Sequence, residues 1–107
     1  MNDATEYDTC IEKMTEIVEE HFQIQIERES FNYHRFTMHM RYFLKRLIEG
    51  EQFIDKNTEL LEWIRREYME IDLCTKKIEE YLREQYHTVC TDEEVLYIMV
   101  HINRICV

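Results

Sequence analysis

The stretch "FNYHRFTMHMRYFLKRL", residues 31–47, carries the clearest helical pattern in the chain. Its large apolar residues recur every three or four positions, which places on one helix face Phe36, Met40, Phe43 and Leu47. Ser30 directly precedes the stretch, where a hydroxyl commonly caps a helix start. Gly50 follows it, where a helix end commonly needs a left-handed residue. The sequence therefore predicts a helix over residues 31–49.

The same periodicity predicts four more helices, over residues 8–22, 58–68, 71–86 and 92–106. We expect Asn57 or Thr58 to cap the helix over residues 58–68. On the buried face of this helix we expect Leu60 or Leu61, Trp63 and Ile64. Thr91 and Glu94 have the spacing of a capping box, which we expect at the start of the last helix. With one glycine and no proline, the composition disfavours turn-rich β folds. We expect one all-α domain over residues 1–107, a five-helix bundle.

Charge and composition exclude several kinds of partner. The net charge of −10 repels nucleic acid and anionic lipid, so we expect this chain to bind neither RNA, DNA nor a membrane. A run of about 20 apolar residues is absent, and the N-terminus lacks the pattern of a signal peptide, which predicts a cytoplasmic protein. The scattered cysteines fit small core residues in a reducing compartment.

Two of the five histidines occupy matching places in the predicted helices. At about 100° per residue, His39 lies about 60° to one side of the apolar stripe of helix 31–49, on an edge shared with Arg35, Tyr42 and Arg46. His101 lies on the corresponding edge of helix 92–106, with Glu94, Tyr97 and Arg104. The solvent-facing His34 and the helix-closing His21 and His87 do not share this arrangement.

Three interpretations of this pair remain open on the residues alone. A histidine at the rim of a core suits a nucleophile, and neighbouring guanidinium groups can hold a phosphoryl group through paired hydrogen bonds. Such histidines also serve purely as packing residues. A metal site made by His39, His101 and Glu94 is the third interpretation, although the nearby arginines disfavour a cation. The chain lacks the glycine-bearing motifs of nucleotide sites and of serine or cysteine nucleophiles, so we expect no cofactor.

Both histidine motifs resemble those of a known family. "FNYHRFTMHMRYFLKRL" and "TDEEVLYIMVHINRIC", whose histidines stand about sixty residues apart, resemble the two motifs of the phosphotransferase-system regulation domain, or PRD. This domain occurs in bacterial transcription antiterminators of the β-glucoside and sucrose type. The resemblance covers nearly the whole chain.

The better match is to the second of the two tandem PRDs in such proteins. That domain typically has arginines four residues before and seven residues after the first histidine, as Arg35 and Arg46 are here. In the first PRD an aspartate often precedes the histidine, where this chain has Met38. The chain departs from the family at Met69, since a proline often follows the tyrosine that is Tyr68 here. This departure leaves the junction between the third and fourth helices open.

The resemblance implies an all-α five-helix domain that forms a homodimer and is not itself an enzyme. It implies phosphorylation of His39 and His101 by the phosphocarrier protein HPr or by a sugar-specific permease component, EIIB. It further implies that this phosphorylation controls the dimer and so transcription. The RNA-binding module of the family is a separate domain, so we expect this chain to be a regulatory domain of a longer protein. The alternatives are a purely structural dimerisation module and the PRD of a DNA-binding activator.

Overall fold

A computed structural model of the chain describes residues 3–52 and 58–106. Within these residues the regular structure is entirely helical, which confirms the all-α prediction. The five helices are α1 (Asp3–Phe22), α2 (Phe31–Ile48), α3 (Thr58–Glu67), α4 (Met69–Tyr86) and α5 (Asp92–Cys106). No helix in the described part of the chain is both long enough and apolar enough to cross a bilayer.

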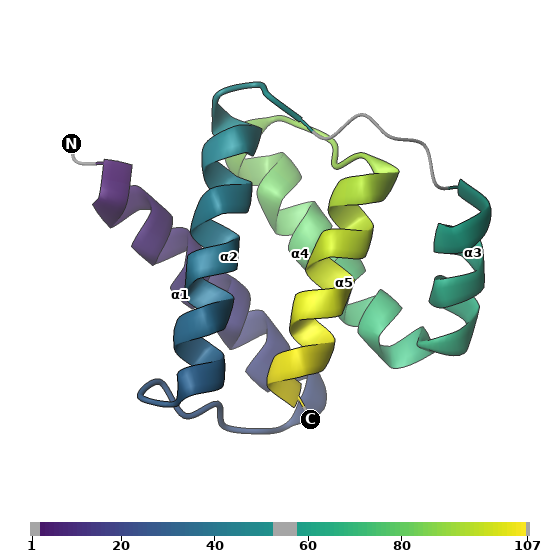
Figure 1. Cartoon of the computed structure of the whole chain (residues 1–107), viewed down its shortest axis with the longest axis horizontal. Coiled ribbons are helices and arrows are strands. Elements are labelled where there is room, and N and C mark those ends of the chain that lie inside the picture. The colour runs from purple at the N-terminus through teal and green to yellow at the C-terminus, as the bar shows by residue number, and fades with distance from the viewer. Residues whose placement is uncertain (1–2, 53–57, 107) are drawn as a thin grey trace.

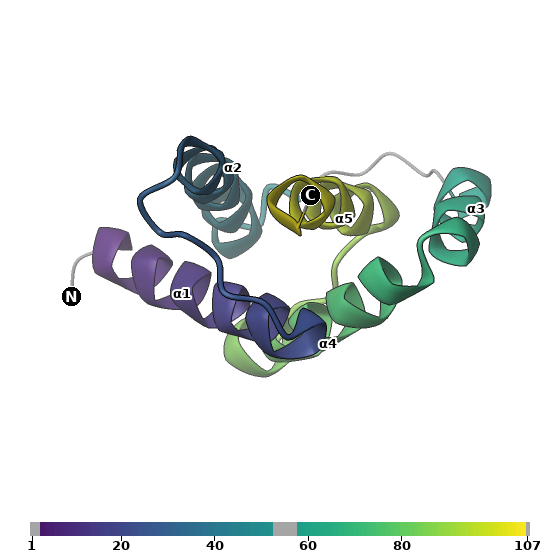
Figure 2. The same ribbon diagram turned by 90° about the horizontal axis from the view of Figure 1, so that it is seen from below.

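The helices form two layers, with α3 at one end. Figure 1 shows α2 and α5 side by side and antiparallel, with α1 and α4 behind them. In Figure 2 the α1–α4 layer lies beneath the α2–α5 layer, and α3 stands beyond α5. The pairing of α2 with α5 brings together the two helices that carry the matching histidines.

Helix α5 is the most apolar segment because it packs on both sides. Ile98 and Ile102 face the main core, which is built largely from α1, α2 and α4. Val95 and Met99 face a smaller apolar cluster that includes Leu61 of α3. Burial on two faces explains why the apolar stripe of this helix is wider than that of an ordinary amphipathic helix.

Local capping signals fix the ends of the histidine-bearing helices as the sequence predicts. The Ser30 side chain accepts a hydrogen bond from the backbone N–H of Tyr33, which starts α2. At the end of α2, Gly50 has φ +75°, and the N–H of Glu51 donates back to the carbonyl of Arg46 at 2.8 Å. This is the hydrogen-bond pattern of a Schellman motif, and it makes a left-handed residue necessary at position 50.

Some predicted boundaries were wrong. Helix α1 begins at Asp3 instead of residue 8, and α4 begins at Met69 instead of residue 71. The junction with α3 is a single residue, Tyr68, with φ −121° and ψ 57°. A non-helical conformation at one position suffices to turn the chain there, so no longer loop separates α3 from α4. Asn57, one of the two proposed caps of α3, lies outside the described residues.

The burial predicted for α3 was wrong at one position. Leu61 is buried and Ile64 is half-buried, as expected for the inner face, but Trp63 is 51% exposed. Helix α3 packs mainly on α4 and α5, so one narrow stripe of its surface is covered. A tryptophan next to that stripe therefore remains half in solvent.

Candidate functional site

The imidazole rings of His39 and His101 stack on each other across the α2–α5 interface. Their centroids are 4.2 Å apart and their planes make an angle of 21°. His39 is partly exposed, whereas His101 is only 6% exposed. The sequence placed both at the rim of the core. The structure sets His101 deeper, because the ring of His39 covers one of its faces.

Tyr97 joins the two histidines into one cluster. Its hydroxyl lies 3.2 Å from Nδ1 of His39 and donates a hydrogen bond to the backbone carbonyl of the same residue, also at 3.2 Å. Its ring meets that of His101 edge-on, with the centroids 4.5 Å apart. The sequence placed Tyr97 beside His101 on α5. The structure adds its hydrogen bonds to His39 on the opposite helix.

A cationic hollow of about 300 Å³ opens beside His101. Two guanidinium groups line it, those of Arg35 on α2 and Arg104 on α5. The remaining lining residues are Asn32, Phe36 and Ile105. The arginines stand four residues before His39 and three after His101, so each lies about one helical turn from its histidine. The hollow can therefore take an anion next to an imidazole.

The surroundings of the pair keep both imidazoles neutral. Burial, followed by the charges of Arg35 and Arg104, holds the pKa of His39 below its ordinary value. For His101, burial and then the neighbouring His39, Arg104 and Arg35 lower the pKa to about 4. A neutral imidazole has a lone pair on one ring nitrogen, and this lone pair is what a nucleophile needs. At neutral pH the site is thus two uncharged imidazoles beside two cationic arginines.

Three other residues proposed for the site, Tyr42, Arg46 and Glu94, do not line the cationic hollow. Arg46 packs its guanidinium over the ring of Tyr42, with its carbon 5.7 Å from the ring centroid. Glu94 is fully buried at the start of α5, where its carboxylate accepts hydrogen bonds from the N–H of Thr91 and from Gln52. With the return bond from the N–H of Glu94 to the Thr91 hydroxyl, this is the predicted capping box.

Two contributors were missed in the sequence. Asn32 shares the wall of the hollow, and its position three residues before Arg35 on the same helix was the available signal. Gln52 connects the chain after α2 to the start of α5, by donating to Glu94 and to the carbonyl of Val89. That long-range contact has no local sequence signal.

The other three histidines have ordinary surroundings. His34 is exposed on α2, as the sequence predicts. His21 lies 2.9 Å from a carboxylate oxygen of Glu70 and 2.9 Å from Nζ of Lys77. His87 takes a left-handed conformation, φ 54°, at the end of α4. The stack therefore sets His39 and His101 apart from them.

The metal interpretation loses its third ligand. His101 and Glu94 stand seven residues apart on α5, which is two turns or about 10 Å along the helix axis. The Glu94 carboxylate is already engaged in the helix cap. Over residues 3–52 and 58–106, the structure shows no group of three His, Cys, Asp or Glu residues arranged to hold a metal.

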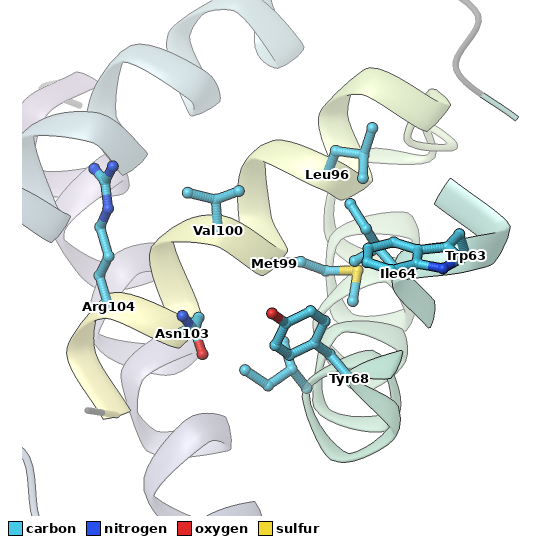
Figure 3. Close-up of a pocket in the computed structure, with 9 residues that line it drawn as sticks. Trp63, Ile64, Tyr68, Leu96, Met99, Val100, Asn103 and Arg104 are labelled. Carbon is cyan, nitrogen blue, oxygen red and sulfur yellow. The ribbon is translucent and has the colours of Figure 1, made fainter. Parts of the chain in front are cut away.

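A second, more apolar hollow of about 280 Å³ lies between α3 and α5. Figure 3 shows Met99 pointing from α5 toward Trp63, Ile64 and Tyr68. Arg104 lines this hollow as well as the cationic one, so the two lie on either side of the last turn of α5.

Comparison with known proteins identifies the family to which the two histidine motifs belong. The family model described as "PRD domain" matches residues 12–105, which include both histidine motifs and all five helices in whole or in part. The chain belongs to the PRD family. The resemblance seen in the two motifs is thereby confirmed, and the stacked histidines are the pair that those motifs contain.

Several curated proteins are similar to this PRD. Transcription antiterminator LicT of Bacillus subtilis (strain 168) is 34% identical over 95 residues, which are 89% of this chain and 34% of LicT. The beta-glucoside operon antiterminator of Dickeya chrysanthemi is 24% identical over the same shares of each chain. Protein GlcT of Staphylococcus aureus (strain JH9) is 23% identical over 97% of this chain and 36% of GlcT. The PRD thus spans about a third of the length of these relatives.

Proposed function

We propose that this PRD is the regulatory domain of a transcription antiterminator, and that it accepts phosphoryl groups on His39 and His101. The donors are HPr or an EIIB component of the sugar phosphotransferase system, in the cytoplasm. The domain is then a substrate of the relay and not an enzyme with turnover. Support for the antiterminator role comes from the relatives, two of which are named as antiterminators.

One observation carries the proposal. Two neutral imidazoles lie stacked beside a hollow that two arginines line. A phosphoryl group on either ring brings about −1.5 to −2 charges and three strong acceptor oxygens. Arg35 and Arg104 supply the planar donor groups that suit such oxygens. Packing alone does not require two guanidinium groups beside a buried histidine.

The same geometry supports a regulatory effect of the modification. His101 is 6% exposed, so its neighbours have to move before a donor protein can reach its ring. A phosphoryl group on either histidine then leaves a charged group at the α2–α5 interface. A shift of a few kcal/mol suffices to redistribute two arrangements of a protein. We propose that phosphorylation shifts this domain between two states of a homodimer.

Labelling by the relay tests the acceptor role directly. The chain is incubated with phosphoenolpyruvate, Enzyme I and HPr, and in parallel reactions with an EIIB component, and intact masses are measured at non-acidic pH. We expect the wild-type chain to gain phosphoryl groups and the His39→Ala, His101→Ala double variant to gain none. The proposal is wrong if no donor labels the wild-type chain. It is also wrong if the double variant is labelled as fully as the wild type.

His34→Ala is the matched control for these variants. His34 lies on the same helix as His39, five residues or about 1.4 turns before it, but is exposed to solvent. We expect this variant to be labelled like the wild type. Labelling that falls equally in His34→Ala and in His39→Ala would mean that helix damage, and not the loss of an acceptor, explains the result.

A further inference from the structure

The hydroxyl of Tyr97 touches His39 at two points. It lies 3.2 Å from the ring nitrogen Nδ1 and 3.2 Å from the backbone carbonyl oxygen of that residue. The ring of Tyr97 is fixed between neighbours, since it stacks on Phe43 and meets both imidazoles edge-on. The hydroxyl therefore has little freedom to turn away from His39.

Counting protons decides how these contacts are made. A phenol has one proton to donate, and a carbonyl oxygen can only accept. When the Tyr97 proton goes to the carbonyl, Nδ1 must donate its own proton to the phenol oxygen. If Nδ1 had no proton, it would compete with the carbonyl for a single donor, and one acceptor would face an oxygen lone pair without a hydrogen between them. Only the Nδ1–H tautomer of His39 satisfies both contacts.

We infer that Tyr97 is a positioning residue that holds His39 in the Nδ1–H tautomer and makes Nε2 the atom that accepts the phosphoryl group. This inference rests on the proposed phosphorylation of His39. It adds which nitrogen reacts and which side chain selects that nitrogen. Tyr97 acts through His39, and no contact between Tyr97 and the phosphoryl group is required.

The transfer step balances with this assignment. The Nε2 lone pair attacks the phosphorus of a phosphorylated donor protein, a new N–P bond forms, and the donor's bond to phosphorus breaks and leaves its electron pair on the donor atom. The proton on Nδ1 stays in place during the step. The positive charge that the ring acquires is shared with the Tyr97 oxygen through the existing hydrogen bond. Burial raises the pKa of Tyr97, which keeps the phenol protonated.

The Tyr97→Phe variant removes both contacts and keeps the ring. In ¹⁵N-labelled chain, long-range ¹H–¹⁵N correlation spectra distinguish protonated from unprotonated ring nitrogens of each histidine. We expect wild-type His39 to show protonated Nδ1 and unprotonated Nε2. In Tyr97→Phe we expect the tautomer ratio to change about fivefold toward Nε2–H, the size of one net hydrogen bond. After labelling, we expect the wild-type phosphoryl group on Nε2, with slower labelling of His39 in the variant.

Tyr33→Phe is the matched control. Tyr33 lies on α2, the helix that carries His39, and the variant loses one buried hydroxyl contact, the 3.0 Å pair with Thr15. We expect this variant to keep the wild-type tautomer of His39 while losing similar stability. A tautomer shift in both variants would mean that general loosening of α2 is responsible.

Separate outcomes test the inference and the function on which it rests. An Nε2–H tautomer in wild-type His39, an unchanged ratio in Tyr97→Phe, or a phosphoryl group on Nδ1 overturns the inference and leaves phosphorylation of the domain intact. An unlabelled wild-type chain with the expected tautomers overturns the proposed function, while the tautomers confirm the role of Tyr97 in positioning the ring.

Discussion

At His101 the protein keeps an imidazole neutral by surrounding it. The ring is 6% exposed and lies against His39, with Arg104 and Arg35 nearby. A further positive charge in that place is poorly solvated and is repelled by the two guanidinium groups. The cost of protonation is therefore a property of the folded state alone, and it couples folding to pH.

The first prediction follows from that coupling. The pKa of His101 is about 4 in the folded chain against an ordinary value of 6.5, so the unfolded chain binds more protons between these two values. The free energy of unfolding should then fall as the pH drops through this window, by about 2 kcal/mol from pH 7 to pH 5. Urea unfolding at several pH values measures this change in the free energy of unfolding.

Variants assign this pH dependence to the site. In His101→Asn the loss between pH 7 and pH 5 should shrink, since the group that takes up the proton is gone. His34→Asn is the matched substitution at an exposed histidine outside the stack, and we expect it to keep the wild-type loss. An unchanged pH dependence in His101→Asn would contradict the account of the buried ring.

At the scale of the helix, the end of α2 depends on one residue. A Cβ at Gly50 would meet nothing within 4 Å, so space places no limit on a side chain there. The backbone angle φ of +75° does limit the choice of residue, because the left-handed region is costly for L-residues. The cost of a substitution at this position is therefore purely conformational.

We predict that Gly50→Ala lowers the free energy of unfolding by about 1 kcal/mol. Gly50→Asn should cost less, because asparagine tolerates the left-handed region. Thermal or urea unfolding of the two variants measures both effects. If Ala and Asn cost the same, the left-handed conformation is not what position 50 requires.

Local signals in the sequence predicted the two ends of α2 and the start of α5, but not the contacts between helices. Ser30, Gly50 and the Thr91–Glu94 box act on their own backbone, so their effect is visible in a few consecutive residues. The hydrogen bonds between Tyr97 and His39 depend on how α2 and α5 pack side by side, which no local pattern encodes. The helical wheel found the pair of histidines because each lies beside its own stripe. It could not show that the rings stack.

At the scale of the whole molecule, the face of α2 next to the site is uncovered. Phe31, Met38 and Tyr42 are 77%, 62% and 53% exposed. Their spacing of seven and four residues puts them on one stripe of the helix, next to His39. Exposed apolar residues that gather in this way commonly mark an interface. We propose that the homodimer forms through this stripe, so that a phosphoryl group on His39 would border it.

Sedimentation equilibrium tests this dimer. We expect Met38→Glu, which puts a carboxylate on the stripe, to raise the dissociation constant about tenfold or more. Val89→Glu is the control, since Val89 is 71% exposed but lies between α4 and α5, away from the stripe. Phosphorylation of the wild-type chain should also change the constant. A constant that neither Met38→Glu nor phosphorylation alters would contradict the stripe as the interface.

We propose the stacked pair as the phosphoryl-acceptor site of the domain. Phosphorus-to-nitrogen correlation spectra of ¹⁵N-labelled chain, recorded after the relay reaction, identify the histidine ring that is bonded to phosphorus. We expect phosphorus bonded to ring nitrogens of His39 and His101, with shifted guanidinium signals of Arg35 and Arg104. Phosphorus on His21, His34 or His87 instead, with the signals of the stacked pair unchanged, would contradict it.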